Sequence, residues 1–194
     1  MKKLWIVLVA ITALLALTFA VADPVASTAR VSVRKLDNDQ GFASGVVLFP
    51  GVVLTAHHVV IHGTLRLDEG NLTSEVIALG NGNPLDIALL RFPAADARCP
   101  CARLADYPAL LDEKVWVVGY PGNIAQIMNT GTAQGTMPVT IQTSSGLFNF
   151  GKRLVLAVPV LPGNSGGGVF VHRDGVFQLV GIVVEGMGHI TLAI

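Results

Sequence analysis

Three short motifs carry a serine, a histidine and an aspartate that together could perform acyl transfer. Ser165 lies in the glycine-rich segment 162–168, which contains four glycines. Glycines adopt positive φ and have no Cβ, so backbone amides there can turn toward the serine hydroxyl and stabilise an oxyanion. His58 and Asp86 precede Ser165 in the chain. This order supplies a general base, its orienting acid and a nucleophile.

The surroundings of His58 and Asp86 favour these roles over ordinary loop positions. His58 follows the apolar strand expected at Val52–Leu54, and Asp86 precedes the apolar run Ile87–Leu90. His57 adjoins His58, and neighbours at a strand end point in different directions, so only one of the two should face the serine. Histidine suits the role of the base, because its imidazole titrates near neutrality.

The segment Gly163–Gly167 also fits the G-x-S-x-G nucleophile elbow of α/β-hydrolases, which would indicate an esterase. Two features argue against an elbow. An elbow opens a helix, whereas the run from Gly168 predicts a strand, and its acid and histidine should follow the serine in the chain. The one usable Asp…His pair in that order is Asp174 and His189, which lie in expected short hairpins without the helices that such a fold needs.

The elements that must position these residues are short β-strands. Runs rich in β-branched and aromatic residues alternate with turns containing Gly, Pro and Asn, and no amphipathic helix of ten or more residues follows the N-terminal segment. We expect an all-β domain over residues 23–194. Its first barrel should span about 28–92, its connector about 93–112 and its second barrel about 113–194.

Residues 1–22 have the pattern of a hydrophobic leader. Lys2 and Lys3 form a basic start, Leu4–Ala22 carries no charge, and Ala20–Ala22 matches the small-x-small pattern of a signal-peptidase site. The apolar run is longer than the ~7–15 residues of a usual signal-peptide core. It approaches the ~20 residues that span a bilayer. A cleaved signal peptide and a retained signal anchor both stay open, and both place the domain outside the cytoplasm.

Neither the composition nor the cysteine count indicates a nucleic-acid partner or a metal site. The 194 residues are 52% hydrophobic and 13% charged with zero formal net charge, and no basic stripe with interleaved aromatics indicates nucleic-acid binding. Cys99 and Cys101 could form a disulfide in an oxidising compartment, although so small a ring is strained, and no second cysteine pair completes a metal site. We expect no metal, no cofactor and no nucleic-acid partner.

The three motifs resemble those of a known family. Thr55–His58, Asp86–Leu90 and Gly163–Gly167 look like the signature motifs of trypsin/chymotrypsin-like serine peptidases. The first and third motifs, with Val118–Gly122, resemble those of the bacterial HtrA/Deg type. We expect no PDZ module of the kind that HtrA proteins append. The resemblance covers about Val31 to Ala193. It implies two six-stranded antiparallel β-barrels with the catalytic residues in the cleft between them.

Carried over residue by residue, the resemblance assigns the catalytic roles. It implies that His58 is the general base, Asp86 its orienting partner and Ser165 the nucleophile, with the amides of Gly163 and Ser165 as the oxyanion hole. Asn164 stands where digestive members carry an aspartate that pairs with a newly cut N-terminus. We therefore do not expect activation by cleavage of a propeptide.

The resemblance also implies a substrate pocket, lined here by Val160, Leu161, Val184, Glu185 and Gly186. These residues are mostly apolar, which favours a small or medium aliphatic side chain in the substrate. The alternation of residues along Ile182–Glu185 does not settle whether Glu185 points into this pocket.

These features predict an exported serine endopeptidase that hydrolyses polypeptides through an acyl-enzyme. Export would make it periplasmic, secreted or anchored outside the cytoplasm, with membrane contact only through residues 4–22 if the leader is retained. The sequence does not determine an oligomeric state. The alternative from another class is a catalytically latent protease-fold protein that binds without cutting, and the esterase is a third.

Overall fold

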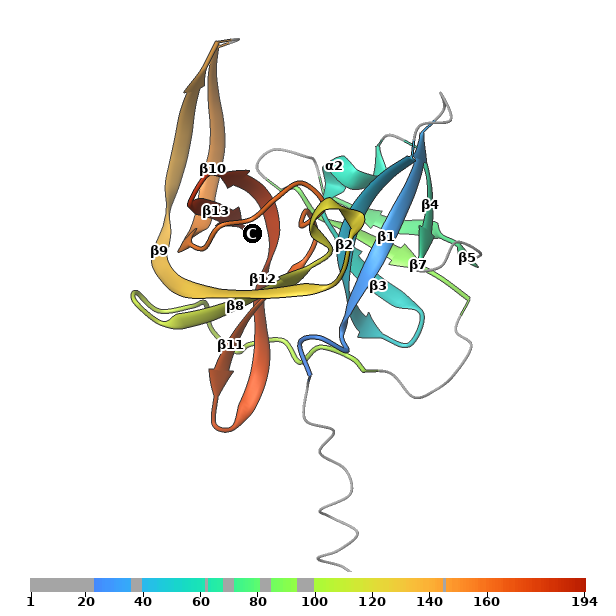
Figure 1. The fold of residues 1–194 in the computed structure, drawn as a ribbon, viewed down its shortest axis with the longest axis horizontal. Coiled ribbons are helices and arrows are strands. Elements are labelled where there is room, and N and C mark those ends of the chain that lie inside the picture. Colours follow the sequence, from blue (N-terminus) through green and yellow to red (C-terminus); the bar gives the residue numbers. More distant parts are fainter. Residues whose placement is uncertain are drawn as a thin grey trace, which may run out of the picture.

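The chain folds into two antiparallel β halves that lie side by side (Figure 1). The computed structural model describes residues 23–35, 40–61, 63–67, 72–80, 85–93, 100–144 and 146–194. The predicted all-β double barrel is confirmed. The predicted leader, residues 1–22, lies outside the described residues.

The first half is a seven-stranded sheet in the order β5-β4-β1-β2-β3-β7-β6. It holds one strand more than the six expected, because the two-residue β5 pairs beside β4. Its strands are β1 (Thr28–Lys35), β2 (Gln40–Phe49), β3 (Val52–Thr55), β4 (Gly63–Leu67), β5 (Leu72–Thr73), β6 (Glu75–Leu79) and β7 (Ala88–Arg91). Between β3 and β4 lies one helical turn, α2 (His57–Val60).

The second half is a closed barrel in the order β10-β13-β12-β11-β8-β9. Its strands are β8 (Lys114–Gly119), β9 (Ile127–Thr143), β10 (Gly146–Ala157), β11 (Gly168–Arg173), β12 (Val176–Met187) and β13 (Ile190–Ala193). A short 3-10 turn, η1 (Pro121–Asn123), joins β8 to β9. The long hairpin of β9 and β10 projects beyond the rest of the barrel (Figure 1).

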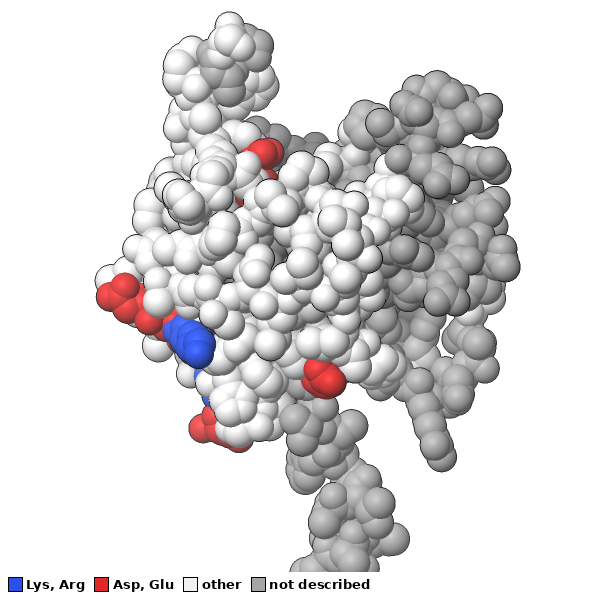
Figure 2. All heavy atoms as spheres, viewed as in Figure 1, with Lys and Arg blue, Asp and Glu red and all other residues white. Residues whose placement is uncertain are grey.

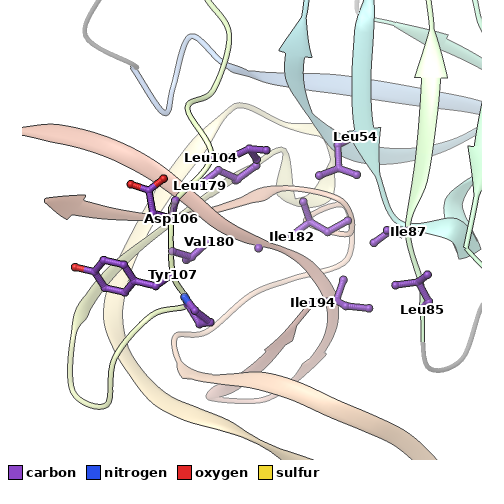
Figure 3. A pocket seen from close by; sticks show the side chains of 13 residues that line it. Leu54, Leu85, Ile87, Leu104, Asp106, Tyr107, Leu179, Val180, Ile182 and Ile194 are labelled. Atoms are coloured by element: carbon purple, nitrogen blue, oxygen red, sulfur yellow. The ribbon is translucent and has the colours of Figure 1, made fainter.

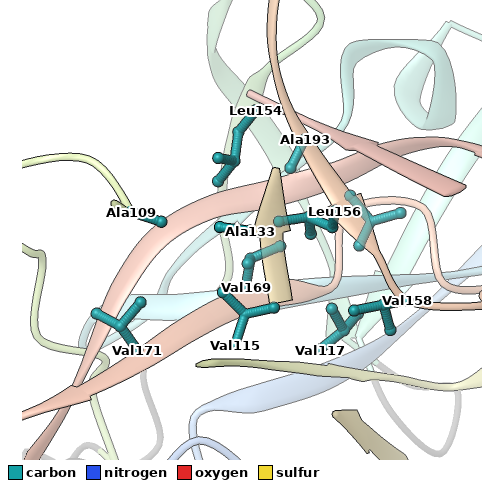
Figure 4. Close-up of a cluster of buried hydrophobic side chains, with 11 residues drawn as sticks. Ala109, Val115, Val117, Ala133, Leu154, Leu156, Val158, Val169, Val171 and Ala193 are labelled. Atoms are coloured by element: carbon teal, nitrogen blue, oxygen red, sulfur yellow. The ribbon is translucent and has the colours of Figure 1, made fainter. Parts of the chain in front are cut away.

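Alternating side chains fill the interior of the second barrel (Figure 4). Successive residues of a strand point to opposite faces, so every second residue can enter the core. Val115 and Val117 do so on β8, Val169 and Val171 on β11, and all four are no more than 1% exposed. Val169, four residues after Ser165, belongs to this core. The core therefore anchors the strand that follows the glycine-rich loop.

A second apolar cluster joins the two halves at the level of α2. Val59 and Val60 of this helix pack in one cluster with Ala88 at the start of β7 and with Val184 and Leu192 of the second barrel. The helix that carries His58 is therefore packed against the second barrel, which carries Ser165.

Charged groups are sparse on the surface that Figure 2 shows. The described Lys and Arg atoms on this face gather in one small area, next to acidic atoms. Among the described residues, no helix has the length and hydrophobicity needed to cross a membrane. Cys101 is disulfide-bonded, whereas Cys99 lies outside the described residues.

Candidate active site

His58 and Asp86 are joined by two hydrogen bonds. The backbone N–H of His58 donates to Asp86 Oδ1 at 2.8 Å, and His58 Nδ1 lies 2.7 Å from Asp86 Oδ2. An ionised carboxylate only accepts, so Nδ1 carries the proton and Nε2 is left as the basic nitrogen. Asp86 therefore sets both the position of α2 and the tautomer of the ring.

The carboxyl group of Asp86 is held in its ionised form. Burial by itself would raise the pKa of Asp86, but the hydrogen bonds from His58, together with the charges of His58 and His57, lower that pKa overall. The side chain of Asp86 is 17% exposed and that of His58 is 41% exposed. The acid is thus shielded while the ring stays accessible from the cleft.

The local structure around the two histidines differs from the strand end expected from the sequence. His57 and His58 lie in the helical turn α2 instead, and Asp86 lies two residues before β7. The helix forms because the carboxylate of Asp86 accepts the exposed N–H of its first turn, where no side-chain cap is present. Both histidines are half-buried.

The loop before Ser165 is a tight turn that leaves two amides free. The N–H of Asn164 donates to Leu161 O at 3.1 Å, and Gly163 has φ +100°. With Pro162 preceding Gly163, this is the pattern of a type II turn, which needs a glycine at its third position. Within the described residues, the N–H groups of Gly163 and Ser165 meet no acceptor, so both can bind an oxyanion.

His58 and Ser165 line one cavity of about 270 Å³. It also contains all five residues expected in the substrate pocket. Its lining is His58, Val160, Leu161, Pro162, Ser165, Val183, Val184, Glu185 and Gly186. Among the described residues, no hydrogen bond joins the Ser165 hydroxyl to His58. Such contacts are often loose before substrate binds.

Two details of this cavity bear on what it could accept. A Cβ on Gly186 would lie 2.5 Å from Val160 Cγ2, so the side chain of Val160 fills the space beside Gly186. Glu185 is exposed and contributes to the lining of the cavity.

Two buried polar side chains near the site were not assigned catalytic roles from the sequence. Asn164 is 3% exposed, and its Nδ2 has no partner among the described residues. Arg153 of β10 is 2% exposed. Burial lowers the pKa of Arg153, and the charge of Asp86 partly opposes this. The sequence signal that could have drawn attention to Arg153 is its position as a charged residue directly before the apolar run 154–160.

Other possible sites lie apart from this cavity or lack the required chemistry. A larger cavity of about 480 Å³ lies between the two halves and the segment 104–108 (Figure 3), and it contains none of the predicted site residues. Over the described ranges, no cluster of three or more His, Cys, Asp or Glu side chains could hold a metal. The elbow alternative is wrong, because β11 follows Ser165 where an elbow would have a helix.

Comparison with known proteins gives a consistent result. The sequence profile described as the trypsin-like peptidase domain matches residues 43–182. A serine protease HtrA-like protein of Staphylococcus epidermidis is 30% identical over 190 residues, which cover 86% of this chain and 32% of that protein. The chain therefore spans about one third of the length of the curated relatives it matches.

Solved structures show the same fold. The active form of a protease from M. tuberculosis has a TM-score of 0.71 and 20% identity, and covers 88% of this chain and 76% of its own. A serine endoprotease from Yersinia pestis has a TM-score of 0.67 and 21% identity, and covers 88% of this chain and 58% of its own. At these identities the likeness establishes the double-barrel fold alone.

Proposed function

Because the chain belongs to the trypsin-like peptidase domain family, we propose that it is a serine endopeptidase with His58, Asp86 and Ser165 as its triad. The observation that carries this proposal is the doubly bonded His58–Asp86 pair, whose histidine lines one cavity with Ser165 beside two free backbone amides.

The chemistry follows from these positions. His58 Nε2 takes the proton of the Ser165 hydroxyl as its oxygen attacks the peptide carbonyl, and the amides of Gly163 and Ser165 bind the oxyanion. His58 then protonates the leaving amine, which leaves an acyl-enzyme on Ser165 Oγ. Water, activated by the same imidazole, attacks the ester and regenerates the serine. Asp86 stabilises the imidazolium in both steps.

A fluorophosphonate probe tests this assignment, because it reacts only with an activated serine. We expect labelling of the wild-type protein, none for Ser165→Ala and a large loss for His58→Ala. His189→Ala, which removes an exposed turn histidine, is the matched control and should label normally. A folded wild-type protein that resists labelling would instead support the latent binding protein.

The aliphatic side chains among the lining residues of the cavity support a preference for small or medium aliphatic residues on the acyl side of the cleaved bond. The side chain of Val160 fills the space beside Gly186, so Val160→Gly should deepen the pocket and shift cleavage toward larger side chains. A peptide-library cleavage profile measures this shift. Leu104→Ala, which alters the other cavity, should leave the profile unchanged, and an unchanged profile for Val160→Gly would contradict the pocket assignment.

Export is proposed from the leader pattern of residues 1–22, with polypeptides outside the cytoplasm as substrates. Sequencing the N-terminus of the mature protein distinguishes cleavage after Ala22 from a retained anchor.

A further inference from the structure

Each free amide of the oxyanion loop belongs to a peptide group whose carbonyl is held. The Gly163 N–H shares its peptide plane with the Pro162 carbonyl, which accepts from Gly122 N at 2.8 Å. The Ser165 N–H shares its plane with the Asn164 carbonyl, which accepts at 2.8 Å from an N–H further along the loop. A trans peptide is planar with N–H and C=O opposed, so fixing the carbonyl fixes the direction of the amide.

Ser44, on β2 of the other half of the molecule, holds the peptide groups that follow these two. Its hydroxyl donates to the Gly163 carbonyl at 2.7 Å, and its backbone N–H donates to the Ser165 carbonyl at 2.8 Å. Ser44 is 0% exposed, so water does not compete for its hydroxyl or its backbone N–H. One residue therefore restrains two peptide groups of the loop.

The remaining bonds of Ser44 extend this restraint in two directions. Its hydroxyl accepts from Tyr120 N at 2.9 Å, which secures the turn whose Gly122 holds Pro162. Its carbonyl accepts from Thr55 Oγ1 at 2.7 Å, which ties it to the strand before α2. The hydroxyl thus donates its single proton to the oxyanion loop and accepts one N–H from the neighbouring turn.

We propose that Ser44 is a positioning residue, whose hydroxyl keeps the oxyanion loop in the conformation that presents the amides of Gly163 and Ser165. The proposal rests on the proposed function. Without the hydroxyl, the partly buried Gly163 carbonyl loses its donor, and a polar group that is shielded from water and left unpaired is costly enough to favour rotation of its peptide. Rotation of the Gly163–Asn164 peptide also takes the Asn164 N–H away from Leu161 O, which opens the turn that presents the Gly163 amide.

Ser44→Ala tests this with a peptide substrate. Since the oxyanion forms only in the transition state, we expect kcat to fall by about 10–10³-fold with KM changed little, the loss expected when one oxyanion donor is displaced. Ser27→Ala is the matched control: Ser27 is also 0% exposed and donates to a backbone carbonyl, that of Pro24. It can lower stability but should leave kcat unchanged.

A second variant covers the case in which Ser44→Ala does not fold. Ser44→Cys keeps the shape and a weak donor, and should fold with kcat between those of the wild type and the Ala variant. Equal kcat values in a folded Ser44→Ala and the wild type would overturn the proposal, as would parallel losses in Ser44→Ala and Ser27→Ala.

Hydrogen exchange gives a readout that does not need activity. In Ser44→Ala the bonded amides of Asn164 and Gly167 should exchange faster than in the wild type and in Ser27→Ala, at a temperature where all are folded. If the wild type resists the serine probe, the proposed function fails, but this comparison still tests the restraint. Unchanged exchange in the loop would refute the role of Ser44.

Discussion

At the residue scale, the acid of the site is bound through both of its oxygens. Asp86 accepts from the backbone N–H of His58 with one oxygen and faces the ring Nδ1 with the other. The first contact needs only an acceptor, whereas the second also decides which ring nitrogen carries the proton. The two contacts can therefore be separated by a substitution that keeps the shape and changes only one oxygen.

Asp86→Asn makes this separation. Its amide oxygen can still accept from the N–H of His58, but its NH₂ group then faces Nδ1. The ring proton must therefore move to Nε2, and a protonated Nε2 cannot act as the base. We expect kcat to fall by about 10⁴-fold at neutral pH with little change in KM. Steady-state kinetics on a peptide substrate measure it. Asp174→Asn, in an exposed turn with φ +52° that asparagine tolerates, is the control. Retention of full activity in Asp86→Asn would contradict the assigned role.

At the element scale, Arg173 ties the segment before β8 to the end of β11. Its guanidinium binds both oxygens of Glu113, at 2.7 and 2.6 Å, and donates to the carbonyls of Tyr107 and Pro108. The Arg173 side chain in this ion pair is only 9% exposed. Planar geometry makes this set of contacts specific to arginine.

Arg173→Lys should therefore lower the free energy of unfolding by about 1–3 kcal/mol, because a single ammonium cannot replace the fork of hydrogen bonds. Urea unfolding followed by circular dichroism measures the loss. Arg91→Lys is the matched control, since the Arg91–Glu75 pair is 3.9 Å apart with side chains 61% and 71% exposed. That change should stay within about 0.5 kcal/mol. Equal losses of unfolding free energy in Arg173→Lys and Arg91→Lys would show that the Arg173–Glu113 pair contributes no more to stability than the exposed Arg91–Glu75 pair.

At the scale of the whole molecule, two restrained carboxyl groups make stability depend on pH. The pKa of Asp86 is lowered because the hydrogen bonds from His58 outweigh burial. The pKa of Glu113 is lowered mainly by its hydrogen bonds to Arg173. A carboxyl group whose pKa is lower in the folded state than in the unfolded chain stabilises the protein at pH values above its unfolded-state pKa. This stabilisation is lost as the pH falls through the folded-state pKa.

The free energy of unfolding should accordingly decrease as the pH falls below the value of 4.5 usual for glutamate. Glu113→Gln should flatten this decrease, because the amide does not titrate. Urea midpoints between neutral pH and strongly acidic pH measure both slopes. Glu75→Gln, at a side chain 71% exposed, is the control. An acid slope in Glu113→Gln as steep as in the wild type would exclude Glu113 as a source.

Local patterns in the sequence predicted much of this molecule. The glycines around Ser165 encode a turn, because Gly163 is needed at positive φ, and alternation of valines encodes the strands β8 and β11 that flank the site. Helix α2 was not predicted, because a segment of four residues is too short to show the periodicity of a helix. It depends on a carboxylate 28 residues away, at Asp86.

The sequence by itself determined the chemical groups of the candidate site, their order and the β character of the chain, because residue types and short-range periodicity express these directly. How the groups meet is visible only in the tertiary contacts: Asp86 binds His58 twice, Val160 fills the space beside Gly186, and Ser44 holds a loop 119 residues away. Such contacts depend on how the two halves pack, and no local pattern records which distant carbonyl a buried hydroxyl will reach.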